Sequence, residues 1–167
     1  MTELSLIQES LADRIFDAQF TSSGNGHRVF ISHASADKPF ARLLAIDLAA
    51  AGHRPWLDEW EILAGESIPT RISEGLREAD YIVVVLSEIA AKSEWVEREW
   101  QSKYWDEVNS KRISVIPVLL RPCEIPMLLK PKKYADFTSD HRNGFEQLLL
   151  AISPSKTRKM KSRTNRS

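Results

Sequence analysis

Apolar and polar positions follow two alternating periods between residues 28 and 152 of the chain. Short apolar runs predict strands at 29–32, 54–57, 81–86, 113–120 and 134–137. Between them, apolar residues spaced three or four apart predict helices at 37–51, 68–79, 93–108 and 141–152. The run Tyr81–Leu86 (YIVVVL) is the strongest strand signal. Its continuous β-branched character is typical of a central strand that is buried on both faces.

Five strands joined by helical crossovers indicate an open, doubly wound α/β sheet in a flavodoxin-like arrangement, with all strands parallel. Gly52 follows the helix 37–51, where a left-handed cap is expected. Pro117 interrupts the run 113–120, so this strand should lie close to an edge of the sheet or be bulged. Between the second strand and the next helix, residues 58–69 are predicted to form a long polar loop.

Sheets of this kind bind ligands outside the carboxyl ends of their strands, at the switch in strand order. Three segments follow predicted strands at this edge: Ser32–Ser35, Asp58–Gly65 and Ser87–Ser93. We therefore expect these loops to form a ligand-binding rim.

The segment Ser93–Trp100 (SEWVEREW) opens the helix that follows the third strand. Trp95 and Glu99 lie one turn apart on one face, beside a stripe that should face the sheet and consists of Val96, Trp100 and Tyr104. The indole and the carboxylate are then placed to form two walls of one site, in which the acid stabilises a positive charge. The alternative is an ordinary surface ion pair between Glu99 and Lys103, worth about 0.3–0.5 kcal/mol.

The two ends of the chain differ from its middle. Residues 1–26 are predicted to be an amphipathic helix and a linker, and the apolar stripe of this helix needs a partner in the same domain or in another protomer. Residues 27–153 are expected to form one domain. The segment 154–167 holds six basic residues and no acid, and is predicted to be disordered.

Composition narrows the class of protein. With 167 residues and 43% hydrophobic residues, the chain fits one globular domain. Residues 1–153 hold 17 basic and 23 acidic residues, so only the basic tail suits contact with nucleic acid. The single cysteine, Cys123, allows no intrachain disulfide and indicates a cytoplasmic protein. No signal peptide is evident and the longest strong apolar run is too short to cross a bilayer, so no membrane contact is expected.

Three other kinds of site do not match the residues. A phosphoacceptor receiver domain needs acids after the first strand and at the end of the third, where this chain has Ser32-His33 and Leu86-Ser87. A phosphate-binding P-loop needs Gly-x-x-x-x-Gly-Lys, which does not occur. The four histidines, at positions 27, 33, 53 and 141, lack the spacing of metal ligands, so no metal site is expected.

Five segments in this order resemble a Toll/interleukin-1 receptor (TIR) domain of the bacterial type: VFISHAS (29–35), WLDEWEILAGESI (56–68), YIVVVLS (81–87), SEWVEREW (93–100) and VIPVLL (115–120). The resemblance covers residues 28–152. It implies the flavodoxin-like fold and a loop after the second strand, here 58–69, that often governs self-association.

Catalytic TIR domains hydrolyse NAD⁺ at the nicotinamide glycosidic bond, with an essential glutamate that ends a Trp-x-x-x-Glu motif. The resemblance places this motif on Trp95 and Glu99, and makes NAD⁺ a substrate with no further cofactor. It also implies a substrate pocket made of His33, Ala34, Ser35, Asp58, Leu63 and Trp95. By position alone, however, a histidine after a strand and an aspartate at a loop start often make structural hydrogen bonds instead.

The chain departs from common family patterns at three places. Ala34-Ser35 stands where some members carry arginines, Leu63 stands where some carry an acid, and Val96 stands where cysteine is common. Contacts to phosphate or ribose that those groups make must come from elsewhere, but the acid itself is present.

Two functions follow from the resemblance. The first is an NAD⁺ glycohydrolase that gives nicotinamide and either ADP-ribose or a cyclic isomer, as a bacterial anti-phage effector or signal generator activated by assembly. A domain this small carries no obvious sensor, so its activity is expected to depend on oligomerisation or on a separately encoded partner. The second is a non-catalytic TIR interaction module, such as a mimic of host signalling.

Overall fold

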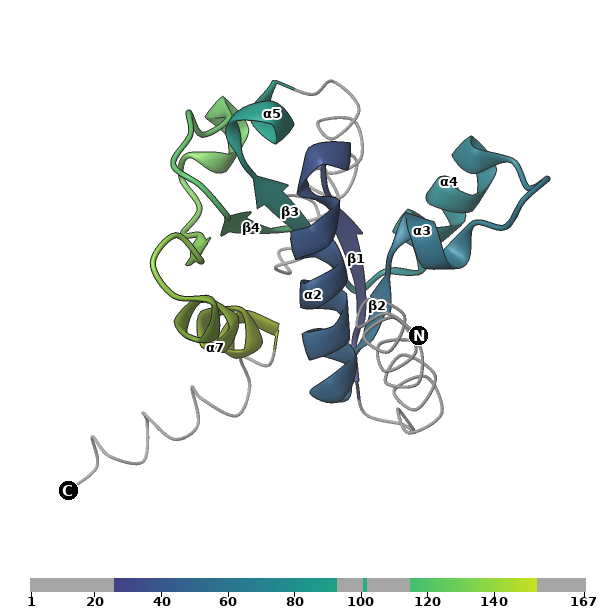
Figure 1. The fold of residues 1–167 in the computed structure, drawn as a ribbon, viewed down its shortest axis with the longest axis horizontal. Helices are drawn as coiled ribbons and strands as arrows, with labels where there is room; N and C mark the ends of the chain where they lie inside the picture. The colour runs from purple at the N-terminus through teal and green to yellow at the C-terminus, as the bar shows by residue number, and fades with distance from the viewer. Residues whose placement is uncertain (1–25, 93–100, 102–114, 153–167) are drawn as a thin grey trace, which may run out of the picture.

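The computed structural model describes residues 26–92, 101 and 115–152 of the chain. Its centre is a five-stranded parallel sheet in the order β2-β1-β3-β4-β5 (Figure 1). The strands are β1 (Arg28–Ser32), β2 (Arg54–Trp56), β3 (Tyr81–Leu86), β4 (Val115–Leu119) and β5 (Ala135–Asp136). The prediction of a flavodoxin-like doubly wound sheet is therefore confirmed.

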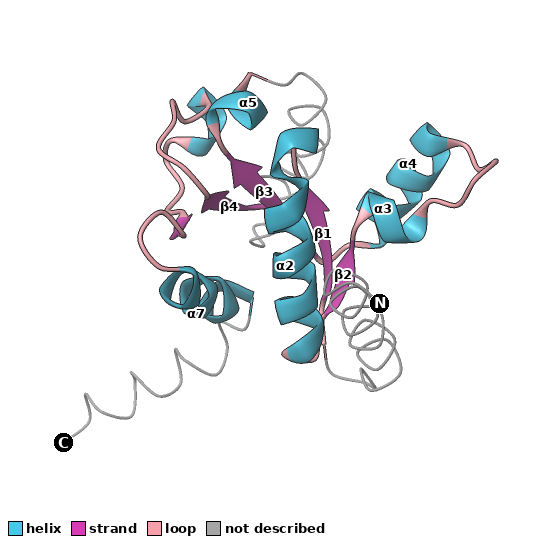
Figure 2. Ribbon diagram, in the orientation of Figure 1, coloured by secondary structure: helices cyan, strands magenta, loops and turns pink. Residues whose placement is uncertain are grey.

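Three longer helices are described: α2 (Lys38–Ala50), α4 (Ile68–Glu78) and α7 (His141–Ile152) (Figure 2). They confirm the helices predicted at 37–51, 68–79 and 141–152. Gly52 has φ of 91°, as expected for a left-handed residue after α2. The predicted helices at 4–20 and 93–108 and the basic tail 154–167 lie outside the described residues, apart from the helical Gln101.

Four short helical segments lie between these elements: η1 (Ser35–Asp37), α3 (Asp58–Glu61), α5 (Glu88–Ala91) and η2 (Met127–Leu129). The prediction that 58–69 is loop throughout is wrong for its first four residues. Three acids lie in the first turn of α3, where they suit the positive end of the helix dipole. Leu57, which is fully buried directly before them, anchors this turn to the core.

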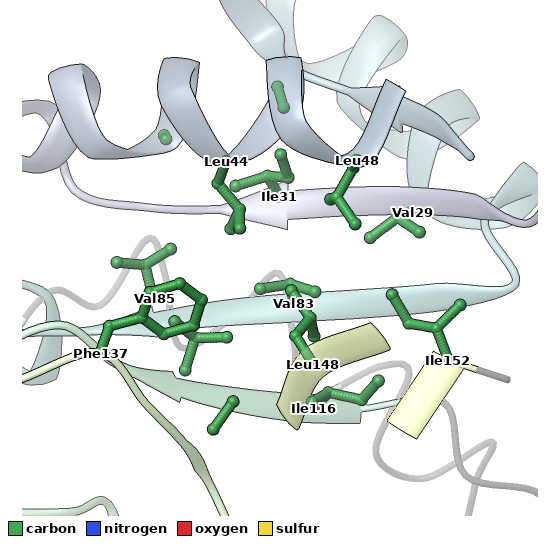
Figure 3. Packing of buried hydrophobic residues seen from close by; sticks show 14 of the residues in the cluster. Val29, Ile31, Leu44, Leu48, Val83, Val85, Ile116, Phe137, Leu148 and Ile152 are labelled. Atoms are coloured by element: carbon green, nitrogen blue, oxygen red, sulfur yellow. The ribbon is translucent and has the colours of Figure 1, made fainter. Parts of the chain in front are cut away.

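The sheet is buried on both faces because successive side chains of its central strands point in opposite directions. One face packs on α2 and α7 and contains Val29, Ile31, Val83, Val85, Leu44, Leu48, Leu148 and Ile152 (Figure 3). The other face packs on α4 and η2 and contains Phe30, Ile82, Val84, Leu86, Ile72 and Leu129. The unbroken apolar run of β3 thus supplies both layers of the core.

Pro117 lies inside β4, next to the edge strand β5. The Leu119 carbonyl accepts a hydrogen bond from Phe137 N–H at 2.9 Å, so the odd-numbered residues of β4 direct their backbone polar groups toward β5. The nitrogen of Pro117 therefore faces the short edge strand, where its missing proton interrupts nothing in the ladder with β3. The register with β3 runs without a break from Val115 to Leu119, so β4 is not bulged against β3. Of the two alternatives predicted from Pro117, the position close to an edge is confirmed.

Within the described ranges, none of the helices is both long enough and apolar enough to cross a membrane.

Close packing at the β2 edge makes Gly75 sensitive to substitution. The Trp56 ring stacks on Phe30 at a centroid distance of 4.7 Å, and a Cβ on Gly75 of α4 would lie 2.6 Å from Trp56 Cε2. Gly75→Ala gains about 1 kcal/mol of helix propensity but overpacks a filled site, which costs about 1–3 kcal/mol. We expect a net loss in the free energy of unfolding, measured in urea. Ser73→Ala, at an exposed position of the same helix, should not destabilise; equal effects would contradict this account.

His53 makes the stability depend on pH. Its ring is buried, its Nδ1 accepts a hydrogen bond from His27 N–H at 3.1 Å, and burial, followed by the charge of His27, lowers its pKa from the usual 6.5. The unfolded chain therefore binds more protons, so this contribution to stability is complete above about pH 6.5 and is lost as pH falls toward the folded pKa. Urea unfolding between pH 5 and 8 should show a smaller loss on acidification in His53→Gln than in the wild type. Parallel curves would contradict this assignment.

Candidate active site

Parallel pairing brings the carboxyl ends of β1 and β3 together. Ser32, the last residue of β1, is in register with Val84, and the chain leaves both strands at the same edge of the sheet. His33, Ala34 and Ser35 follow β1 directly, and Ser87 follows β3. Asp58 lies at the same edge, after β2, which pairs with β1 on the side opposite to β3. It directly follows the buried Leu57. The loops therefore meet at one edge of the sheet, as the strand pattern predicts, and their binding of a ligand stays a prediction.

His33 is the centre of this rim. Its side chain is only 4% exposed, with Nδ1 at 2.9 Å from the Ala34 carbonyl oxygen and Nε2 at 3.2 Å from Asp58 Oδ1. The Ala34 carbonyl and the Asp58 carboxylate are both acceptors, so a proton on either ring nitrogen is donated to the oxygen that this nitrogen faces. Because both nitrogens are engaged, the geometry favours the structural role for His33 over that of a general base.

Asp58 presents an ionised carboxylate at the open side of the rim. Its side chain is 45% exposed, and Oδ1 also accepts a hydrogen bond from the Glu59 N–H at 2.8 Å. The hydrogen bond from His33 is the main reason that the pKa of Asp58 lies below its usual value. Asp58 thus makes the backbone hydrogen bond that is common for an aspartate at the start of a loop, and its carboxylate also holds the His33 ring in place.

The rest of the 58–67 segment is tied down by two arginines. Arg42 of α2 makes a two-pronged ion pair with Glu59 of α3. Arg71 of α4 donates to the Glu61 carbonyl oxygen at 3.0 Å, and its Nε lies 3.4 Å from the Glu66 carboxylate. These contacts connect the segment to helices on both sides.

Leu63, at the far end of this segment, is 68% exposed. Its backbone N–H donates to the Glu66 carboxylate at 2.9 Å, which shapes the turn. Ser35 is also exposed, whereas Ala34 is buried. The substrate contacts assigned to these three residues stay predictions. Trp95 and Glu99, the other two assigned residues, lie outside the described residues.

A second polar link at the rim was not found from the sequence. Ser87 Oγ donates a hydrogen bond to Asp37 Oδ2 at 2.5 Å, and both residues are buried. Ser87 before a short helix is a possible cap signal, but nothing in the sequence marks Asp37 as its partner, since the contact spans 50 residues.

A cavity of about 490 Å³ opens beyond β3, between α5 and the segment 124–130. Its volume is in the range of small-molecule sites. It is lined by Leu86, by apolar side chains such as Ile125 and Met127, and by Glu88, Lys92, Glu124 and Lys130. None of these charged residues was singled out from the sequence, because they come from two segments that only the fold brings together.

In the part of the chain that the structure describes, no three His, Cys, Asp or Glu side chains are grouped so that they could hold a metal ion.

Proteins with related sequences are named for NAD⁺ chemistry. The chain is 37% identical over 90 residues to the 2' cyclic ADP-D-ribose synthase BtTIR of Bacteroides thetaiotaomicron. The matched segment covers 53% of this chain and 31% of that protein. It is 36% identical over 98 residues to the NAD(+) hydrolase PdTIR of Paracoccus denitrificans, with 58% and 32% covered. The chain thus spans about a third of the length of these relatives.

Solved structures with the same fold include other TIR domains. The TIR domain of the Toll-related receptor TRR-2 of Hydra magnipapillata superimposes with a TM-score of 0.57 at 20% identity, over 80% of this chain and 97% of that one. The TIR domains of the activated Roq1 resistosome give a TM-score of 0.58 at 18% identity, over 76% and 99%.

The family model for the TIR domain matches residues 29–149, from the first residues of β1 into α7. This range contains β2 to β5, all of β1 except Arg28, the His33–Asp58 contact and the Asp37–Ser87 contact. Since it spans well over half of the chain, the protein belongs to the TIR domain family.

Proposed function

We propose that this TIR domain is an NAD⁺ glycohydrolase that cleaves the bond between nicotinamide and ribose. The observation that carries the proposal is the Trp95-x-x-x-Glu99 motif, which follows β3 and α5 along the chain. The carboxyl end of β3 lies at the edge of the sheet where doubly wound folds bind ligands. The relatives named as NAD(+) hydrolases and cyclic ADP-D-ribose synthases support the same chemistry.

The chemistry needs few protein groups. When the C1′–N bond breaks, both bonding electrons leave with the pyridinium nitrogen, so nicotinamide departs neutral and no acid has to protonate it. Positive charge develops on the ribose, and one carboxylate is sufficient to stabilise it or to form a transient ester. Water then adds to C1′ and loses a proton, which gives ADP-ribose. Glycosidases with poorer leaving groups need a second carboxylate.

We assign this carboxylate to Glu99 and an aromatic wall to Trp95. The ionised, half-exposed Asp58 is suited to accept hydrogen bonds from ribose hydroxyls, while His33 holds it in place. Ala34 and Ser35 are small residues beside this pair, and phosphate contacts there must come from backbone or from other side chains. If the wall excludes water, a group of the ADP-ribose itself attacks C1′ and a cyclic isomer forms.

We further propose that the protein acts in assembled form, as an anti-phage effector or signal generator that a separately encoded partner triggers. The charge distribution supports assembly. Residues 58–78, beside the β2 edge, contain six carboxylates and two arginines, whereas residues 121–134, before the β5 edge, contain four basic residues and one acid. Figure 1 shows α3 and α4 beyond β2, and α7 on the other side of the molecule. Opposite charges at opposite edges suit head-to-tail contacts between copies, in which the 58–69 segment takes part.

The same surfaces would serve a non-catalytic interaction module, which is the second candidate function. The exposed Leu63 and Ile68 in the 58–69 segment favour it, because exposed apolar side chains at a loop often mark a protein contact.

Turnover of NAD⁺ separates the two functions. The purified protein is incubated with NAD⁺, with and without a crowding agent that promotes assembly. It should release nicotinamide, which is measured by chromatography. Glu99→Gln should lower the rate at least about 10³-fold, because the group that stabilises the transition-state charge is lost. Glu97→Gln is the matched control, since it removes an acid from another side of the same predicted helix. An assembled wild type that consumes no NAD⁺, or a Glu99→Gln protein as fast as the wild type, favours the interaction module.

Assembly should depend on the two charged edges. Lys130 and Lys133 are exposed, so the double variant K130E/K133E should reverse the charge of the β5 edge without disturbing the core. Light scattering combined with turnover should show smaller assemblies and lower activity, and raised salt should act in the same direction on the wild type. Arg28→Glu, a charge reversal of a half-exposed residue at the amino end of the inner strand β1, is the control. A dilute wild-type monomer with full activity would refute the dependence on assembly.

A further inference from the structure

The carboxylate of Asp37 is buried directly behind the rim. Asp37 is 9% exposed and Ser87 is 4% exposed, and Ser87 Oγ donates to Asp37 Oδ2 at 2.5 Å. Neither residue belongs to the substrate contacts assigned above. The distance lies at the short end of the range for O–H···O hydrogen bonds.

This contact joins two segments that leave neighbouring strands. Asp37 ends η1, which continues the His33–Ser35 segment, and its N–H donates to the Ala34 carbonyl at 2.9 Å. Ser87 directly follows β3 and caps α5, because its Oγ accepts a hydrogen bond from Ala90 N–H at 3.2 Å. The Asp37–Ser87 hydrogen bond therefore fixes the segment after β1 relative to the segment after β3.

A carboxylate is a costly choice for this buried position if it serves packing alone. Burial of a charged group is unfavourable unless hydrogen bonds compensate it, and an apolar side chain would fill the same space without that cost. Unlike an apolar contact, the Asp37–Ser87 hydrogen bond is directional. It therefore specifies how the segment after β1 is oriented relative to the segment after β3.

We infer that Asp37 is a positioning residue of the NAD⁺-cleaving site, which acts through Ser87 to hold the His33–Ser35 rim in register with the carboxyl end of β3. The inference rests on the function proposed above. It adds a buried layer of polar contacts beneath the rim to the exposed contacts that touch substrate.

The inference predicts a particular pattern in the kinetics. Small misplacements of groups around a reacting centre cost up to about 10²-fold in rate. Asp37→Ala should therefore lower kcat about 10- to 100-fold with KM within about three-fold of the wild type. Ser87→Ala should have a similar effect, and the double variant should be no slower than the slower single variant, because both remove the same bond.

The conservative variant separates position from charge. Asp37→Asn keeps an oxygen that accepts the Ser87 hydroxyl proton, so kcat should recover to within about five-fold of the wild type. An Asp37→Asn protein as slow as Asp37→Ala would overturn the positioning role in favour of a requirement for the negative charge itself.

Asp80 provides the matched control for a general loss of stability. Its Oδ2 accepts a hydrogen bond from Arg28 N–H at 2.9 Å, so it also links β1 to β3, but at the amino ends of these strands. Asp80→Ala should lower the melting temperature and leave kcat unchanged. If Asp80→Ala slows turnover as much as Asp37→Ala, loss of stability explains both and the inference fails.

A second readout does not depend on turnover. Amide hydrogen exchange of Ala90 reports the Ser87 cap, and it should become faster in Asp37→Ala but not in Asp80→Ala. Unchanged Ala90 exchange overturns the link whatever the activity. An inactive wild type with faster Ala90 exchange in Asp37→Ala refutes the proposed function and leaves the link in place. An active wild type with full kcat in Asp37→Ala refutes the positioning role alone.

Discussion

The structure depends on one constraint, the burial of β3 on both faces. Every side chain of this strand except Tyr81 is at most 1% exposed, so its backbone groups have no access to water and must pair with strands on either side. β1 and β4 provide this pairing in parallel, and parallel neighbours require helical crossovers that cover the two faces. The order of the five strands and the positions of α2, α4 and α7 follow from this requirement.

The same constraint creates the rim. Parallel strands end at one edge, and there the apolar core gives way to His33, Asp58, Asp37 and Ser87. These residues form two polar contacts of different character. The His33–Asp58 contact is half-exposed and open to a ligand, whereas the Asp37–Ser87 contact is buried and holds the backbone beneath it. A site that binds a charged substrate has use for both, because the exposed groups recognise the ligand and the buried ones maintain its geometry.

The charged residues outside the rim divide by edge of the sheet. Carboxylates gather around α3 and α4, where Arg42 and Arg71 hold the 58–67 segment, and basic residues gather before β5. The net charge of the chain is zero, although the chain contains an acidic region around α3 and α4 and a basic region before β5. Such a distribution is suited to ordered contact between copies of the chain, and it makes any such contact sensitive to salt.

The sequence alone determined the five strands, their parallel arrangement and the helices α2, α4 and α7, because alternating apolar periods and right-handed crossovers leave few other arrangements. From Pro117 it also predicted a strand that is close to an edge or bulged, and the edge position is the one observed. Only the tertiary structure decided that residues 58–61 are helical, that both nitrogens of His33 are engaged, and that Asp37 meets Ser87. The reason is physical: hydrophobic periodicity is a local property of the chain, whereas a hydrogen bond between residues 25 or 50 positions apart forms only where packing brings its donor and acceptor together.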